Sequence, residues 1–136
     1  SLFANEPTTF EGEYYVVRDA MNNPKPVQSK LPVCIGGRGR RRTLPLTARF
    51  ADHWNYSGTD AAEFGELRGV LHGACADIGR DPATITTSFL LRWSGDADQL
   101  LADRDAFAAQ GADLAIISVP KHVDPSVVDE LAAIVG

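Results

Sequence analysis

The segment LPVCIGGRGRRRTLPLTARFADHWN, residues 31–55, changes its pattern twice along its length. A short apolar run is followed by interleaved glycines and arginines, and apolar residues at helical spacing then begin at Leu44. Glycine allows positive φ and close approach to a ligand, and the free N–H groups at a helix start attract anions. The segment therefore predicts a strand, a glycine turn and a helix. The turn comprises Gly36, Gly37, Arg38, Gly39, Arg40, Arg41 and Arg42.

The four arginines of this turn predict an anionic ligand. They would repel one another and the positive end of the helix unless a negative group lay among them. A phosphate is the obvious candidate. The alternative is a plain strand–helix turn whose arginines point into water.

Composition narrows the class of protein. The 136 residues are 44% hydrophobic and 23% charged, as in ordinary globular domains. The net charge of −5 argues against a nucleic-acid partner, and no apolar run approaches the roughly 18 residues that would predict a membrane span. Cys34 and Cys75 fit buried thiols better than a disulfide framework, which predicts a cytoplasmic protein.

Strand and helix patterns alternate along the chain. We interpret residues 1–136 as a single domain, in which 1–30 form a hairpin with a turn at Glu11-Gly12 and a connector, and 31–136 form four strand–helix units. The predicted strands are residues 33–35, 51–56, 85–93 and 114–119, and the predicted helices begin at residues 44, 60, 96 and 124.

This alternation predicts an α/β fold with parallel strands and right-handed crossovers. Periodicity leaves two architectures open, an open doubly wound sheet and part of a (β/α) barrel. The almost wholly apolar run 114–119 is typical of a strand buried on both faces.

Several polar and aromatic residues lie where strands are expected to end. Asn55 is a candidate ligand contact, whereas Trp54 fits the core or a cavity wall and His53 is expected to face away from both. Arg92 could line a cavity mouth, although a solvated arginine is the simpler interpretation. No metal site is predicted, because the histidines have no partners at ligand spacing.

Several signatures, in register, resemble those of the luciferase-like monooxygenases, and within them the oxidoreductases that use the deazaflavin coenzyme F420. The signatures are TFEGEYY (9–15), PKPVQ (24–28), IGGRG (35–39), RTL (42–44), ARFADHWN (48–55) and GRDP (79–82). Together they cover nearly the whole chain.

The resemblance implies a TIM (β/α)8 barrel about twice as long as this chain, which would supply the C-terminal half, with the small hairpin as an insertion. The coenzyme would be F420, with FMN as the alternative, and the arginine cluster suits the extra carboxylates of the deazaflavin tail. In that family the loop after the fifth strand contacts the coenzyme phosphate. By that match the phosphate is held by Gly36, Gly37, Arg38 and Gly39, with Arg41, Arg42 and Thr43 adding charge or hydrogen bonds, and we add Asn55 as a further candidate contact.

Pro45 is a departure from the pattern of the resemblance. Proline inside a helix costs about 3 kcal/mol, so we expect the helix to begin near Thr43 or Leu44, after a longer arginine-rich loop.

The expected function is hydride transfer to or from a small-molecule substrate, with the missing N-terminal half of the barrel as a partner. No catalytic acid or base is apparent, so the catalytic residues stay unknown and this half alone is expected to be inactive. The alternative is a non-catalytic half-barrel that binds a phosphate ligand or assembles with itself. A half-barrel exposes strand edges, so we expect a homodimer or higher oligomer.

Overall fold

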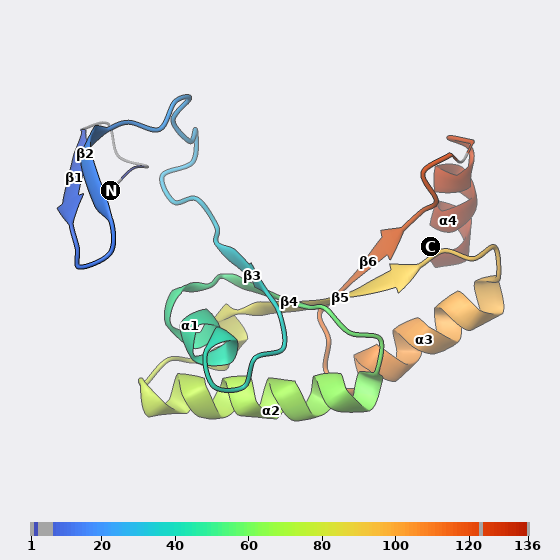
Figure 1. Ribbon diagram of the computed structural model, residues 1–136. Helices are drawn as coiled ribbons and strands as arrows, with labels where there is room; N and C mark the ends of the chain where they lie inside the picture. The colour runs from blue at the N-terminus through green and yellow to red at the C-terminus, as the bar shows by residue number, and fades with distance from the viewer. Residues whose placement is uncertain (1, 3–6, 123, 136) are drawn as a thin grey trace. The chain divides into compact units, whose positions relative to one another are not determined.

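The structure, a computed structural model, describes residues 2, 7–122 and 124–135 (Figure 1). The chain divides into two compact units, residues 1–32 and 33–136, close to the boundary expected between connector and strand–helix units. That these units form a single domain stays a prediction.

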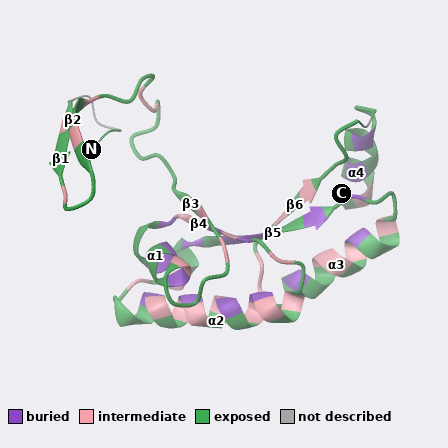
Figure 2. Ribbon diagram, in the orientation of Figure 1, coloured by how far each residue is buried: buried purple, intermediate pink, exposed green. Residues whose placement is uncertain are grey.

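The first unit contains the predicted antiparallel hairpin. It pairs β1 (Thr8–Glu11) with β2 (Val16–Ala20). The turn is wider than predicted, because the N–H of Gly12 donates to the carbonyl of Tyr15 at 2.9 Å. Tyr14 and Tyr15 therefore lie in the turn and are exposed, and no described residue of this unit is buried (Figure 2).

The second unit is a parallel sheet covered by helices. Its strands are β3 (Cys34–Gly36), β4 (His53–Tyr56), β5 (Thr86–Arg92) and β6 (Leu114–Ser118), in that spatial order. Its helices are α1 (Thr43–Phe50), α2 (Ala61–Asp77), α3 (Ala97–Ala109) and α4 (Val127–Val135), with a short 3-10 turn at Pro82–Thr84. The predicted strand bounds differ from these by one or two residues.

The strand order decides between the two architectures that periodicity left open. A doubly wound sheet reverses its strand order and carries helices on both faces. Here the strands follow their order in the chain, and Figure 1 shows α1, α2 and α3 on one side of the sheet. This is the arrangement of consecutive units in a (β/α)8 barrel, so the predicted fold class is confirmed.

Aromatic rings form the core between the sheet and its helices. Trp54 of β4 stacks on Phe64 of α2, with ring centroids 5.4 Å apart, and Phe89 of β5 stacks on Phe107 of α3 at 4.1 Å. Tyr56 contacts both helix phenylalanines edge-on or tilted. These rings fix which face of β4 and β5 is covered by helices.

The opposite side of the sheet, which we call the open face, carries the alternate residues of each strand. His53 and Asn55 lie there together, because side chains two apart in a strand share a face. The prediction that His53 faces away from Asn55 is therefore wrong, and it is Trp54 that points the other way. Cys34 is also exposed, contrary to prediction, whereas Cys75 is buried.

Strand β6 is not buried on both faces as its apolar run predicted. Leu114 and Ile116 on the open face are 45% and 37% exposed, while Ala115 and Ile117 pack against the core. The strand is at the edge of the sheet, and no described element covers its open face.

Helix α1 accommodates Pro45 in the way that the sequence predicted. The helix begins at Thr43, so the proline is in the first turn, where its missing N–H would have had no intrahelical partner. Leu44 and Ala48 are buried, while Leu46 and Phe50 are exposed.

Helix α4 begins later than the predicted start at Asp124-Pro125. The Asp124 carboxylate accepts the N–H of Ser126 at 2.9 Å, which forms a turn before the helix starts at Val127. Val127 and Leu131 of this helix are buried in the core, whereas Val128 is 64% exposed.

The GRDP signature has a structural role. Gly79, at φ 68°, ends α2, and the Arg80 guanidinium then donates to the carbonyls of Ala48 and Ala51 at 2.9 and 2.7 Å and to the Thr84 hydroxyl at 3.0 Å. Arg80 thus satisfies carbonyls at the C-terminal end of α1 that have no intrahelical partner.

We expect Arg80→Ala to lower the free energy of unfolding by about 1–3 kcal/mol, because it removes charge-assisted hydrogen bonds to partly buried carbonyls. Arg80→Lys should recover part of the loss, since an ammonium cannot span both carbonyls. Urea unfolding followed by circular dichroism measures the effect. Arg104→Ala, which removes an exposed pair with Asp105, is the control, and equal losses in the two alanine variants would contradict this role.

Candidate functional site

The glycine–arginine loop, residues 36–43, leaves β3 at the carboxyl edge of the sheet. The N–H of Gly37 donates to the carbonyl of Asn55 at 3.1 Å, so the loop begins as an extension of the β3–β4 pairing. Gly37 has φ 129°, a backbone conformation that residues other than glycine rarely adopt. The carbonyl of Gly39 accepts the N–H of Leu44 at 3.0 Å, which closes the loop onto the first turn of α1.

Thr43 fills the inside of the loop. A Cβ on Gly39 would lie 2.6 Å from the Thr43 hydroxyl, and one on Gly37 would lie 3.2 Å from its methyl group. A Cβ on Gly36 would meet only the Asn55 carbonyl, at 3.8 Å. The close approach of backbone to Thr43 therefore requires glycine at 37 and 39 but not at 36.

Trp54 ties this loop to the core. Its indole Nε1 donates to the Gly37 carbonyl at 2.9 Å while its ring stacks on Phe64. Trp54 is therefore a core residue that holds the loop, in agreement with the core interpretation of its sequence position.

The four arginines of the loop form two groups, two that are paired with carboxylates and two that are not. Arg38 forms an ion pair with Glu63 at 3.0 Å and Arg40 one with Glu66 at 2.7 Å, both on α2. Arg41 and Arg42 are exposed, and their side chains have no hydrogen bond or ion pair with the described residues. Carboxylates of the protein thus supply part of the negative charge that the sequence predicted among these arginines.

A buried phenol orients the first of these carboxylates. The Tyr56 hydroxyl donates to Glu63 at 2.5 Å, and this bond, followed by those from Arg38, lowers the pKa of the Glu63 carboxyl. Burial, and then the bond to Glu63, raises the pKa of Tyr56. Glu63 therefore stays ionised and keeps Arg38 on the side of the loop that faces α2.

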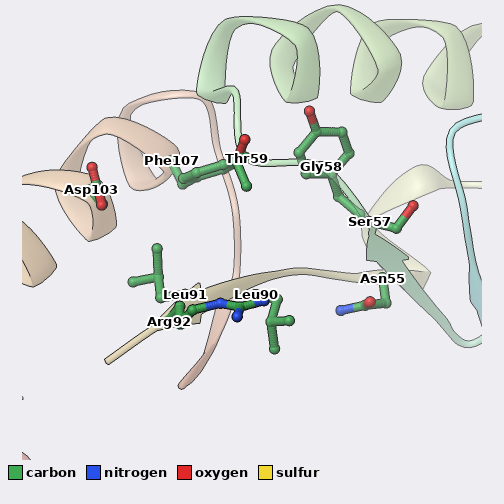
Figure 3. A pocket seen from close by; sticks show the side chains of 10 residues that line it. Asn55, Ser57, Gly58, Thr59, Leu90, Leu91, Arg92, Asp103 and Phe107 are labelled. Atoms are coloured by element: carbon green, nitrogen blue, oxygen red, sulfur yellow. The ribbon is translucent and has the colours of Figure 1, made fainter. Parts of the chain in front are cut away.

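A cavity of about 410 Å³ lies at the carboxyl ends of β4 and β5 (Figure 3). Barrel enzymes place their sites at this edge. Its lining residues are Asn55, Tyr56, Ser57, Gly58, Thr59, Leu90, Leu91, Arg92, Asp103 and Phe107. Arg92 thus lines a cavity, which was one of the two interpretations of its place at the end of a strand.

Asn55 joins this cavity to a polar cluster on the open face. Its Nδ2 donates to the Ser88 hydroxyl at 2.8 Å, and His53 Nε2 lies 2.6 Å from the same oxygen. Ser88 is fully buried. Asn55 is therefore held in place by its neighbours and borders both the glycine loop and the cavity.

A second cavity, of about 240 Å³, lies at the opposite edge of the sheet, among Arg68, His72 and Asp113. Barrel sites do not occur at the amino ends of the strands, so we do not assign it to the site. No group of three metal-ligating side chains occurs among the described residues. No helix among the described residues is long and apolar enough to span a membrane.

The fold and this loop define the class as a (β/α)-barrel protein with a glycine-rich turn between the first strand of its parallel sheet, β3, and its first helix, α1. A comparison with protein families matches residues 1–130 to the luciferase-like monooxygenases, and the chain belongs to that family. Uncharacterized proteins of Mycobacterium tuberculosis (H37Rv) and Mycobacterium bovis are each 31% identical to it over 81 residues, which are 60% of this chain and 28% of those proteins.

Solved structures share the fold at low identity. An F420-dependent secondary alcohol dehydrogenase in complex with an F420–acetone adduct has a TM-score of 0.70 at 14% identity, and the match covers 85% of this chain and 51% of that one. An F420-dependent tetrahydromethanopterin reductase from Methanopyrus kandleri has a TM-score of 0.59 at 17% identity, covering 74% and 29%. A riboflavin lyase with modified FMN and riboflavin has a TM-score of 0.52 at 12% identity, covering 76% and 24%. The chain thus spans about half the length of the first of these.

Sequence reasoning located the loop but missed the residues that organise it. The structure brings together all eight predicted contacts, Gly36 to Gly39, Arg41 to Thr43 and Asn55, around one turn and the neighbouring strand end. Glu63 and Glu66, which hold two of the arginines, had one available signal, their three-residue spacing on one face of a helix near its start. No signal in the sequence indicated the role of Tyr56.

The two adjacent glycines give a matched test of the loop. Gly37→Ala should lower the free energy of unfolding by about 1–3 kcal/mol, because alanine is strained at φ 129°. Gly36→Ala should be close to neutral, because its Cβ has room. Urea unfolding of both variants measures the difference, and equal losses would show that the loop does not depend on this conformation.

The Tyr56–Glu63 pair predicts a pH-dependent stability. Because the folded pKa of Glu63 is lowered, its contribution is fully present above its ordinary pKa of about 4.3 and is lost as the pH falls through the folded value. The stability difference between the wild type and Glu63→Gln should therefore be larger at pH 7 than near pH 3. Tyr56→Phe should reduce the pH dependence of that difference. Urea midpoints across this range test it, and a difference that does not change with pH would rule the coupling out.

Proposed function

We propose that this chain supplies the C-terminal half of the barrel of an oxidoreductase that uses F420 for hydride transfer, with FMN as the alternative coenzyme. The observation that carries the proposal is the glycine–arginine loop at the carboxyl edge of a barrel sheet. Family membership supports an enzyme of the oxidoreductase or monooxygenase type.

The loop fits a phosphate group. Between Arg38 and Thr43 the backbone N–H groups have no hydrogen-bond acceptor among the described residues, and they precede the start of an α-helix. Phosphates bind such starts through N–H groups and the helix dipole. Gly36, Gly37, Gly39 and Thr43 would shape the cradle, and Asn55 would border it.

The arginines would act in two ways. Arg41 and Arg42 are free to form charge-assisted hydrogen bonds with a phosphate or with carboxylates of a coenzyme tail. Arg38 and Arg40 would support the loop through Glu63 and Glu66 and add positive potential at longer range. This division differs from the expectation that Arg38, Arg41 and Arg42 all contact the phosphate.

The bound coenzyme would supply the hydride acceptor or donor, and this chain would bind and orient it. The described residues near the loop include no group that we assign as a catalytic acid or base. Residues that activate the substrate would then come from the other half of the barrel, whose four strand–helix units this chain does not contain.

F420 is preferred over FMN because several arginines suit a ligand with more than one anionic group. Both F420 and FMN carry a phosphate, so the phosphate loop alone does not distinguish between these coenzymes. Two of the structural neighbours are described as F420-dependent, and a third holds modified FMN. The cytoplasm remains the proposed location.

A second candidate function rests on the exposed open face. Leu90, Leu114 and Ile116 lie on it, and β3 and β6 are free sheet edges among the described residues. A half-barrel of this kind could bind a phosphate ligand and assemble with another copy without catalysis.

Titration of the whole protein with F420 and with FMN tests the proposal. We expect Arg41→Ala and Arg42→Ala each to weaken binding of the preferred coenzyme about tenfold, through loss of a charge-assisted hydrogen bond. Arg40→Ala, which removes an arginine already paired with Glu66, should have a smaller effect.

Unchanged coenzyme affinity in both the Arg41→Ala and Arg42→Ala variants would show that the loop is not part of the coenzyme site. Tight coenzyme binding by the whole protein without turnover of reduced coenzyme would favour the non-catalytic alternative.

A further inference from the structure

Arg92 is a cation at the mouth of a cavity. It is the last residue of β5, it is exposed, and its side chain has no hydrogen bond or ion pair within the described part of the chain. Arg38 and Arg104, by contrast, are both paired with carboxylates. The charge of Arg92 is therefore available to a ligand in the cavity that it lines.

The rest of the cavity wall is amphipathic. Leu90, Leu91 and Phe107 contribute apolar surface, and Figure 3 shows Leu91 pointing from β5 toward Phe107, whereas Leu90 points to the other side of the strand. Neutral hydrogen-bond donors line it as well, the hydroxyls of Ser57 and Thr59. The volume of about 410 Å³ is within the range of small-molecule sites.

Asn55 offers a further donor toward this space. One N–H of its amide goes to Ser88, which leaves the second N–H of the same Nδ2 without a partner among the described residues. The carbonyl of Asn55 accepts the N–H of Gly37, so one residue of the cavity wall is bonded to the glycine–arginine loop.

Asp103, on α3, limits the charge that the cavity can accept. Its carboxylate accepts from Gln99 Nε2 at 2.8 Å and lines the same cavity as Arg92. A dianionic phosphate would be repelled by this carboxylate more than a monoanion would. A single guanidinium also matches one carboxylate in both charge and geometry.

We propose that this cavity binds the carboxylate of a small molecule with an apolar body, with Arg92 as its ion-pair partner and Asn55, Ser57 and Thr59 as neutral donors. The carboxylate belongs either to the substrate or to the tail of the coenzyme. Only this choice of source rests on the proposed function, because the cavity and its unpaired arginine do not depend on it.

Benzoate and its neutral analogue benzamide are matched probes for this site, since they share an apolar ring. In an NMR titration of the wild-type chain we expect benzoate to bind about tenfold more tightly than benzamide, as for a charge-assisted hydrogen bond. Arg92→Gln should abolish that preference. Arg104→Gln, which makes the same change of charge on α3 outside the cavity, should retain it.

Equal binding of the two probes to the wild type, or a preference that survives in Arg92→Gln, would overturn the proposal. Dispersed amide spectra of both variants control for folding.

Coenzyme titrations of Arg92→Gln identify the source of the carboxylate. Weaker binding of F420 with unchanged binding of FMN would assign the carboxylate to the deazaflavin tail. Unchanged binding of both, with the benzoate preference lost, would assign it to the substrate. If the wild type bound neither coenzyme yet preferred benzoate through Arg92, the coenzyme proposal would fail and the carboxylate site would stand.

Discussion

The alternation of side chains along β4 is the constraint on which the rest of the second unit depends. Trp54 and Tyr56 point toward the helices, where they pack with Phe64 and Phe107, and each also makes one polar contact at the edge of the core. Trp54 binds the Gly37 carbonyl and Tyr56 binds Glu63. A buried ring with a polar group at its rim can hold a surface loop at low cost, because its position is already fixed by packing. The same alternation sends Asn55 to the open face.

Charge around the glycine–arginine loop is arranged by the helix that follows β4. Glu63 and Glu66 on α2 take up Arg38 and Arg40, so the most positive stretch of an acidic chain is partly neutralised within the fold. These pairs are exposed and contribute little to stability. Their effect is on geometry, since they separate two tethered arginines from two free ones. That separation, rather than the number of arginines, is what makes an anion-binding role for Arg41 and Arg42 specific.

The sequence predicted element types well and the environments of several residues poorly. Strand–helix order, the start of α2 near residue 60 and the start of α1 near Pro45 follow from local rules, because capping and proline chemistry act within one turn. The facing of His53 also follows from a local rule, because residues 53 and 55 share a face of the strand, and the prediction for His53 misapplied that rule. The exposure of β6 does not follow from local rules, because an apolar run such as 114–119 has the same pattern whether or not its second face is covered.

The sequence by itself determined that strands and helices alternate, that residues 36–43 form a glycine turn into a helix, and that the chain resembles the family to which it belongs. Those features are local, since they depend on backbone freedom at glycine, on proline and on apolar spacing. Only the tertiary structure decided that the sheet is of barrel type and that Glu63 and Glu66 hold two arginines of the loop. It also showed that Asn55 and Arg92, 37 positions apart, line one cavity. Parallel pairing places strand ends from distant parts of the chain side by side, and the spacing of residues along the chain carries no record of that proximity.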